Sequence, residues 1–492
     1  MTFCGDLKKD MAALRERLKD DDTIVFRTFE NKTSMQLRGC VVYTEVLVST
    51  PVIDHYIVAP LINTDMKALR PKPYLVDTVM EKVLEANEVK AHSTLEDAIS
   101  ALLIGDTLIL LDGAPCVIAA NSKSYPARGV GAPETETTVA GPKEAFTEVL
   151  VFNMGLLRRK MKNPKLKLKT MEVGKITKTR ICLSYVEGLV EPALLEELTA
   201  RLQHFEIDAA LDSNYLAELC RDDRASPFKT IGTTERPDVV AGKLLEGRVA
   251  ILCDGSPFAL TVPFLFLENF QSNEDYYNHF YFATFTRIMR YFSFFLTISL
   301  PGLYVALIAY HKEMIPLNLL LSIVNSRDAV PFPAVVEMVI LLVLFDLLRE
   351  AGLRLPAPIG GTIGTVGGIV LGQSIVTARL VSAEMIIIVA VCAITSFLTP
   401  KLDIELILCR MLILFFAATL GIYGYAIGII AILVHLASLR SFGVEYLSYL
   451  SATSAQTAKD VYVRAPWWMM RRRPAAIQRR NLTRLRHKGA KR

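Results

Sequence analysis

Residues 105–115 read GDTLILLDGAP, and residues 247–257 read GRVAILCDGSP. Both stretches begin with Gly, continue as a run that changes from polar to apolar, and end in Asp-Gly-x-Pro. They lie 142 residues apart (247 against 105), and other segments repeat at the same spacing. These are Tyr43–Val48 with Tyr185–Val190, Phe26–Glu30 with Leu168–Glu172, and Arg38 and Cys40 with Arg180 and Cys182. Several blocks at one offset predict tandem copies of one fold.

Each copy is expected to contain a helix, two strands, two helices and a hairpin. The hairpin turns are predicted at Asp112-Gly113 and Asp254-Gly255, because Asp-Gly suits a two-residue type I′ turn. The fold class is therefore α/β, with two tandem duplicated domains in a cytoplasmic region. We expect the first repeat over 1–121 and the second over 142–275. Between them, residues 122–141 are rich in Pro, Gly, Thr and Glu and predict a flexible linker.

The charged residues are unevenly distributed along the chain. Of the 492 residues, 52% are hydrophobic and 21% are charged, but 291–440 hold only 8 Lys/Arg and 8 Asp/Glu. The tail, residues 441–492, carries 12 Lys/Arg against 2 Asp/Glu, so the formal net charge of +5 arises there. The excess of positive charge in the tail thus does not indicate a nucleic-acid-binding surface, and no nucleic acid is expected as a partner.

Apolar segments follow the repeats and predict an all-α multi-pass transmembrane domain over 276–445, with a basic cytoplasmic tail over 446–492. About six spans are expected, at Tyr291–Tyr310, Pro331–Leu348, Ile359–Val376, Ala383–Thr399, Ile404–Leu420 and Ile422–Leu439. A single bent helix is the alternative for the last two. The shorter segment Leu317–Val324 is expected at the membrane interface. The placement of Lys and Arg around the spans predicts that the N- and C-termini are both cytoplasmic.

The third segment has two distinct faces. Gly360, Gly364, Gly368 and Gly372 recur every four residues and predict a ridge for close helix packing. The other face gathers Thr362, Thr365, Val366, Ile369 and Gln373, which predict a pore lining in a symmetric oligomer. Packing inside one subunit's bundle is the alternative.

Three charged residues fall inside the predicted spans, namely Glu337, Asp346 and Arg410. Charges at membrane depth usually face a bundle interior or a cavity, so a Glu337–Arg410 pair is one possibility. Outside the spans, the basic run Arg158-Arg159-Lys160 is expected to be a solvated helix end.

Nothing in the sequence predicts catalysis. It contains no P-loop, GxGxxG, HExxH or GxSxG motif, and its eight cysteines form no CxxC. Several cysteines lie in apolar runs, which is typical of buried, reduced thiols in a reducing cytoplasm. We therefore expect no enzyme activity, no metal site and no cofactor.

Several strings resemble the A subunits of GerA-family spore germination receptors. They are Thr234-Glu235-Arg236-Pro237-Asp238, Leu245 to Ile251, Pro331 to Ala334 with Glu337, Leu348 to Pro356, Leu439 to Val444, and Arg464-Ala465-Pro466-Trp467-Trp468. The resemblance covers about residues 140–475.

The resemblance implies a multi-pass protein of the spore inner membrane. It implies two partner subunits, a transporter-like B subunit that binds the nutrient and a lipoprotein C subunit. It also implies a homo-oligomer, a pentamer, that forms a nutrient-gated cation channel and triggers spore germination. The alternative functions are a secondary transporter and a membrane scaffold for a signalling complex.

Overall fold

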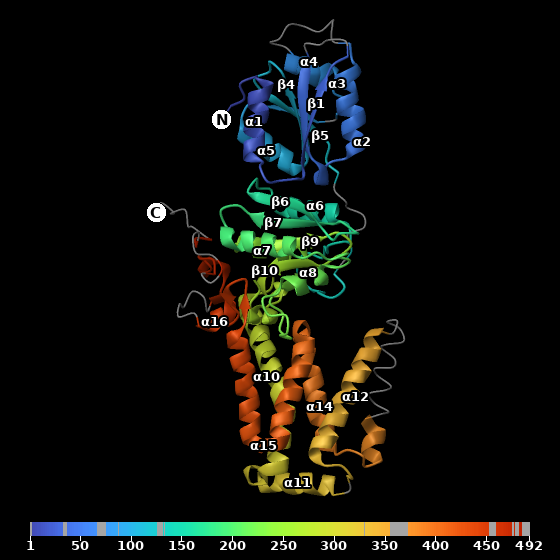
Figure 1. Cartoon of the computed structure of the whole chain (residues 1–492), viewed down its shortest axis with the longest axis vertical. Coiled ribbons are helices and arrows are strands. Elements are labelled where there is room, and N and C mark those ends of the chain that lie inside the picture. Colours follow the sequence, from blue (N-terminus) through green and yellow to red (C-terminus); the bar gives the residue numbers. More distant parts are fainter. Residues whose placement is uncertain are drawn as a thin grey trace.

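The computed structural model describes residues 2–32, 37–65, 75–86, 88–124, 131, 133–328, 330–354, 372–451, 459–474, 477 and 482–484. Along its longest axis the chain forms three parts, namely a first α/β unit, a second α/β unit and a helical region (Figure 1).

The first unit is built on an antiparallel sheet with strand order β1-β2-β4-β5-β3. Its strands are β1 (Ile24–Glu30), β2 (Arg38–Thr44), β3 (Val89–His92), β4 (Asp106–Leu111) and β5 (Val117–Asn121). Its helical elements are α1 (Leu7–Arg17), η1 (Glu45–Leu47), α2 (Thr50–Val52), η2 (Ile53–Val58), α3 (Ala59–Asn63), α4 (Leu75–Lys82) and α5 (Leu95–Ile104).

The second unit has a sheet of the corresponding order, β6-β7-β9-β10-β8. Its strands are β6 (Leu166–Val173), β7 (Thr179–Val186), β8 (Gly232–Thr234), β9 (Val249–Cys253) and β10 (Ala259–Val262). Its helices are α6 (Leu150–Lys160), α7 (Pro192–His204), α8 (Ser213–Cys220) and α9 (Pro237–Leu245). The predicted α/β class is confirmed for this half of the chain.

Two local features differ from the sequence predictions. Each sheet gains an edge strand, β3 or β8, which is too short and polar to give a hydrophobic pattern. The hairpin turns are also longer than two residues, because β4 ends at Leu111 and β5 begins only at Val117. Gly113 has φ 86° and Gly255 has φ 84°, but neither preceding Asp has a positive φ, so the predicted type I′ turn is wrong. A Pro two residues after each Gly has no N–H to donate to the ladder, which explains the longer loop.

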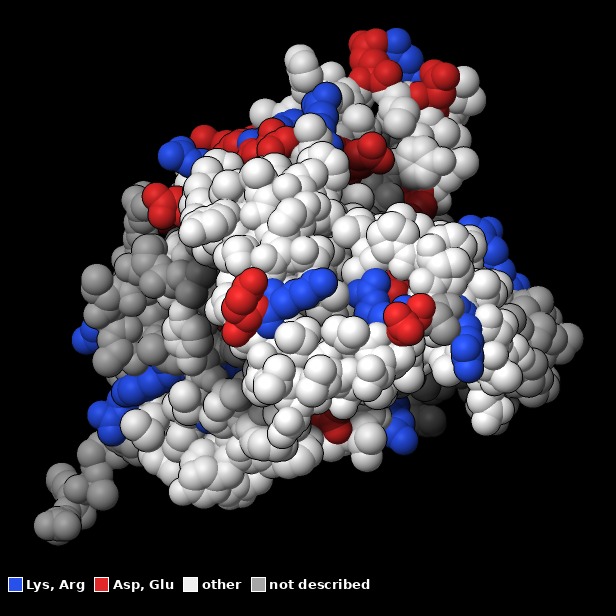
Figure 2. Space-filling view, turned by 90° about the horizontal axis from the view of Figure 1, so that it is seen from below, with Lys and Arg blue, Asp and Glu red and all other residues white. Residues whose placement is uncertain are grey.

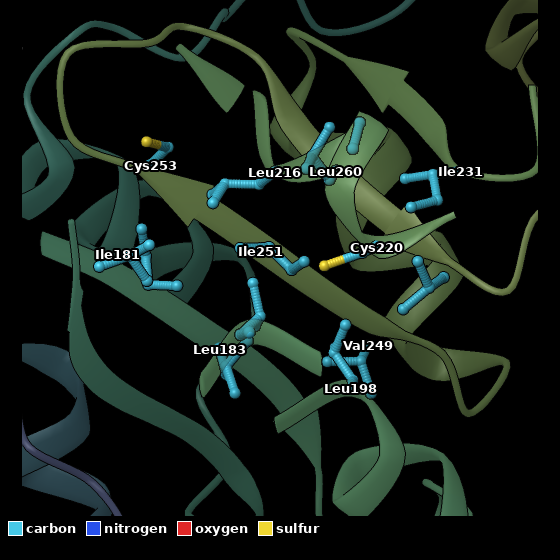
Figure 3. Close-up of a cluster of buried hydrophobic side chains, with 14 of the residues drawn as sticks. Ile181, Leu183, Leu198, Leu216, Cys220, Ile231, Val249, Ile251, Cys253 and Leu260 are labelled. Carbon is cyan, nitrogen blue, oxygen red and sulfur yellow. The ribbon is translucent and has the colours of Figure 1, made fainter. Parts of the chain in front are cut away.

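The second sheet is covered on both faces. On one face, Ile181, Leu183 and Ile251 pack with residues of α7 and α8, including Leu198 and Cys220 (Figure 3). On the other face, the alternate strand residues pack with α6 and α9. This alternation is the period of two expected of strands buried on both sides.

The two α/β units share a buried contact at α6. The guanidinium of Arg158 is fully buried and pairs with Asp21 of the first unit. Gly155 permits the close approach, since a Cβ there would lie 2.8 Å from the carbonyl oxygen of Val46. The prediction of a solvated helix end is therefore wrong for Arg158, because its charge is compensated across the interface between the units.

The helical region begins with α10 (Phe280–Tyr310), which packs against the later helices α14 and α15. The short α11 (Leu317–Arg327) crosses the far end of the region (Figure 1). The remaining helices are α12 (Ala334–Arg354), α14 (Ala383–Ser396) and α15 (Asp403–Ser438).

Within α15 the chain reverses direction at Gly421, whose φ of 60° and ψ of −137° are not helical. A Cβ on Gly428 would lie 3.1 Å from the Cα of Ile413, which a straight helix would hold about 22 Å away. Residues 403–420 and 422–438 thus form a helical hairpin, and the alternative of a single bent helix is wrong.

Two helical segments of the described chain are long and apolar enough to cross a membrane, Phe280–Tyr310 and Pro400–Ser438. The helix α14 is apolar but shorter. Charged side chains are sparse in the view along the molecule from the helical end (Figure 2). The expected number of about six spans stays a prediction.

Candidate functional site

The second α/β unit and the helical region meet at a set of polar and aromatic contacts, which we call the junction. Its first group lies where α9 and β9 meet η4 (Phe266–Phe270). Arg248 pairs with Glu268 at 2.7 Å, and Lys243 pairs with the same carboxylate. Burial raises the pKa of the Glu268 carboxyl, but Arg248 and Lys243 together lower it more, so its pKa lies below the usual value.

The second group fixes the start of α10 to η5 (Asn273–Tyr276). The buried carboxylate of Asp275 accepts hydrogen bonds from Arg287 at 3.1 and 3.2 Å and from Arg290 at 2.8 and 2.9 Å. Two guanidinium groups on one carboxylate hold the first turns of α10 in a defined position.

The third group brings the C-terminal tail back onto α10. Arg287 donates to the backbone oxygens of Asp460 and Val461, and Tyr291 donates its hydroxyl to the Val461 oxygen at 2.9 Å. The hydroxyl of Tyr276 donates to the Asp460 carboxylate at 3.0 Å. Burial raises the pKa of Asp460 to about 6, although Arg287 and Tyr276 act in the opposite direction.

The fourth group follows the last helix directly. β11 (Arg440–Ser441) and β12 (Val444–Glu445) form a small hairpin whose turn residues, Phe442 and Gly443, have φ of 48° and 76°. Phe442 is buried in the core formed with α7 and α8, and Arg201 lies 4.4 Å from its ring centroid. A large residue at positive φ is unusual, and here its side chain joins the end of α15 to the second unit.

Residues Glu235 and Arg236, from the family-like string at 234–238, hold the described part of the predicted linker. The Glu235 carboxylate accepts from the backbone N–H groups of residues 134, 135 and 136, at 3.1, 2.6 and 3.2 Å. Arg236 donates to the carbonyl oxygens of Glu136 and Pro142 at 3.2 and 2.8 Å. At least this part of the linker is anchored to the second unit.

The three predicted intramembrane charges lie in the helical region but pair differently from the expectation. Arg410 on α15 pairs with Asp346 on α12 and is only 2% exposed. Glu337 instead accepts from the backbone N–H and hydroxyl of Ser382 at 2.5 and 2.6 Å and lies 3.5 Å from Arg327. The Glu337–Arg410 pair is wrong because Glu337 lies at the α11 end of α12, while Asp346 lies further along the helix, beside Arg410.

The predicted pore lining and glycine ridge lie mostly outside the described residues. This holds for Gly360, Thr362, Gly364, Thr365, Val366, Gly368 and Ile369. Gly372 and Gln373 are described. Gln373 is exposed, and among the described residues a Cβ added to Gly372 would meet no atom within 4 Å. Both assignments stay predictions.

Sequence reasoning missed the junction. Its residues Arg248, Glu268, Asp275, Arg287, Phe442 and Asp460 form contacts between segments up to about 200 positions apart, which no local periodicity reveals. The family-like strings were the available signal, since Arg248, Phe442 and Arg464 all lie in them. In the part of the chain that the structure describes, no group of three or more His, Cys, Asp or Glu could hold a metal ion.

Comparison of the sequence with known proteins identifies the family of the chain. The chain is 39% identical to spore germination protein KA of Bacillus subtilis (strain 168) over 480 residues, which is 97% of this chain and 88% of that protein. It is 36% identical to the uncharacterized membrane protein YfkQ of the same organism, over 99% of this chain and 93% of that one.

A solved structure also matches, the N-terminal domain of the A subunit of the Bacillus megaterium spore germinant receptor GerK3. The two share 28% sequence identity with a TM-score of 0.43, over 54% of this chain and 98% of that one. Finally, the sequence pattern of the Bacillus/Clostridium GerA spore germination proteins matches residues 12–476. The chain therefore belongs to the GerA family of spore germination proteins, which confirms the resemblance seen in its sequence.

Proposed function

We propose that the chain is the A subunit of a nutrient germinant receptor and that it oligomerises into a nutrient-gated cation channel in the spore inner membrane. The observation that carries this proposal is the family match over residues 12–476, which includes both α/β units, the helical region and much of the tail. A nutrient-binding B subunit and a lipoprotein C subunit are the partners that such a receptor requires.

Membrane insertion through several spans is supported by α10 and by the α15 hairpin. The helix α10 and the whole segment Pro400–Ser438 that contains the hairpin are long and apolar, and α10 packs against α15. The two α/β units and the described tail lie at the same end of the helices (Figure 1). This arrangement supports an even number of spans with both termini in the cytoplasm.

The cation path is proposed to run along the third apolar segment, lined by Thr362, Thr365, Val366, Ile369 and Gln373. A Cβ on Gly372, at the end of the ridge, would meet no atom of the described residues within 4 Å. Open space at a glycine leaves room for a helix of another subunit to approach closely. We take this as support for packing between copies, a pentamer in the proposed assembly.

Gating is proposed to act through the junction. Arg287 and Asp275 hold the start of α10, and Phe442 holds the end of α15, against the same α/β unit. Because both attachments are buried, a displacement of that unit would move both helices together. The junction would thus transmit a movement imposed by the nutrient-binding partner.

The proposal is tested in spores of the organism that encodes the chain, by measuring nutrient-triggered release of monovalent cations. Removal of the chain should abolish the release. Phe442→Asn should abolish or strongly delay it, because Asn tolerates positive φ but cannot fill the core site. Arg440→Gln, at an exposed position of the same hairpin, is the matched control and should behave as wild type. Normal release in spores that lack the chain, with no related receptor present, would contradict the proposed function.

A further inference from the structure

A cavity lies between the second α/β unit and the folded-back tail. Its volume is about 120 Å³, and the charged residues Glu246, Arg248, Lys459, Asp460, Arg473 and Arg484 line it. This space exceeds the roughly 10–15 Å³ that one water molecule needs on the same measure, so it can hold a small polyatomic group.

The lining carries more positive than negative charge. With Arg472 included, five cationic residues face two acidic ones. Both acids already have partners. Glu246 lies 3.4 Å from Arg248, which also pairs with Glu268, and Asp460 interacts with Tyr276 and Arg287 of the junction. The charge of Arg248 is thus compensated, and the remaining positive charge of the lining comes from Lys459, Arg472, Arg473 and Arg484.

Two segments of the tail hold this charge in a fixed arrangement. Residues 471–473 and 482–484 are joined by backbone hydrogen bonds from Arg473 to Leu482 at 2.7 Å and from Arg484 to Arg471 at 2.8 Å. Burial lowers the pKa of Arg473, and the charge of Arg484 lowers it further. Like charges are thus held close together, an arrangement that an anion between them would stabilise.

We propose that this cavity binds a small, multiply charged oxyanion from the cytoplasmic solution, such as a phosphate group, between Arg473 and Arg484. Guanidinium groups suit this ligand because they present several donors in a plane that matches oxyanion geometry. A dissolved ion is favoured over a lipid headgroup because the tail lies beside the second α/β unit, beyond the ends of the helices (Figure 1). The site is independent of the proposed channel activity.

The two tryptophans of the chain provide a local reporter. Trp467 and Trp468 are the only ones in the sequence, and the Arg484 guanidinium lies 5.2 Å from the Trp467 ring centroid. A ligand that draws Arg484 toward the cavity should change the tryptophan emission. We therefore propose titrating the purified full-length chain in detergent with inorganic phosphate, against chloride at matched ionic strength, with calorimetry as a second readout.

Phosphate, but not chloride, should bind and shift the emission. Arg484→Gln and Arg473→Gln should each weaken binding by about 10-fold to 100-fold, as expected for losing a charge-assisted hydrogen bond. Arg440→Gln, outside the cavity, should bind as wild type. If Arg484→Gln detaches the tail, Arg484→Lys decides the matter. It retains the charge but not the planar set of donors, so it should bind phosphate more tightly than Arg484→Gln and less tightly than wild type.

Four results would overturn the proposal. The first is an equal response to chloride and phosphate, and the second is unchanged phosphate binding in both Gln variants. The third is binding only to vesicles of an anionic phospholipid, which would assign the positive charge to the membrane surface instead. The fourth is phosphate binding by an Arg484→Lys variant with wild-type emission that is no tighter than binding by Arg484→Gln.

Discussion

The ion pair between Asp346 and Arg410 gives the sharpest prediction for the helical region. Arg410 is 2% exposed and Asp346 is 21% exposed, so Asp346→Asn would leave a buried guanidinium without its charge partner. Removing one partner of a buried pair costs about 3–5 kcal/mol. Because Asp346 is only partly enclosed by the chain, we expect the lower end, about 3 kcal/mol, which raises the population of the locally opened helices roughly 100-fold.

The assay uses cysteines that the chain already has. Cys409 precedes Arg410 and Cys392 lies on α14, and both are buried. Alkylation of the purified protein, read by mass spectrometry at these two positions, measures local opening. The Asp346→Asn variant should be alkylated there about 100-fold faster than wild type.

Two comparisons decide whether the pair itself is responsible. Arg410→Met combined with Asp346→Asn should recover most of the loss, because no uncompensated charge is then buried. Arg354→Gln breaks an exposed pair with Glu350 and should change the rate by less than about fivefold. Alkylation of Asp346→Asn at the wild-type rate would contradict this prediction. So would a double variant whose loss of stability equals the sum of the losses in the two single variants.

Three further predictions concern the hairpin, the tail and the proposed pore. A Cβ on Gly424 would lie 1.9 Å from a backbone carbonyl oxygen across the hairpin. Gly424→Ala should therefore lower the stability of the helical region by at least about 1–3 kcal/mol. Gly352→Ala is the control and should not lower it, because a Cβ there would meet no atom of the described residues within 4 Å. The pKa of Asp460 is raised from 3.8 to about 6 in the folded chain, where Glu246, Arg287, Tyr276 and Arg484 face it. The docked tail thus binds a proton that the undocked tail would release, so tail docking should weaken as pH rises through that interval. The tryptophan emission should report this change, and Asp460→Asn should remove it. Ile369→Ala should make spores leak cations without nutrient, because a smaller apolar constriction wets more easily, and Gly368→Leu should abolish assembly. Tight, unresponsive spores for Ile369→Ala with a silent Gly368→Leu would reverse the two assigned faces.

The sequence predicted the α/β units because their pattern is local and repeated. Runs such as residues 108–111 and 249–253 are continuously apolar, and the structure buries them on both faces of a sheet. The edge strands β3 and β8 were not predictable in this way, because they have only four and three residues and pair only at one side. Arg158 was misassigned for a related reason, since its partner Asp21 lies in the other unit.

The candidate site was less predictable than the fold. Hydropathy identified Glu337, Asp346 and Arg410 as unusual charges in apolar segments. Which of them form ion pairs depends on how neighbouring helices are aligned along their axes, and the sequence does not give that alignment. Phe442 gave no local signal at all, because its positive φ and its burial arise from docking against α7 and α8. The resemblance to a family was the sequence feature that selected Phe442, whereas Asp346 and Arg410 lie outside the family-like strings.

The central claim, that this chain forms a cation path, is tested most directly by conductance. The purified full-length chain would be reconstituted in planar bilayers, alone and with its B and C partner subunits. The account predicts cation-selective conductance that depends on the chain, increases with nutrient when the partners are present, and persists without nutrient in Ile369→Ala. Bilayers that contain the folded, assembled receptor and remain non-conducting with nutrient, for wild type and Ile369→Ala alike, would contradict it.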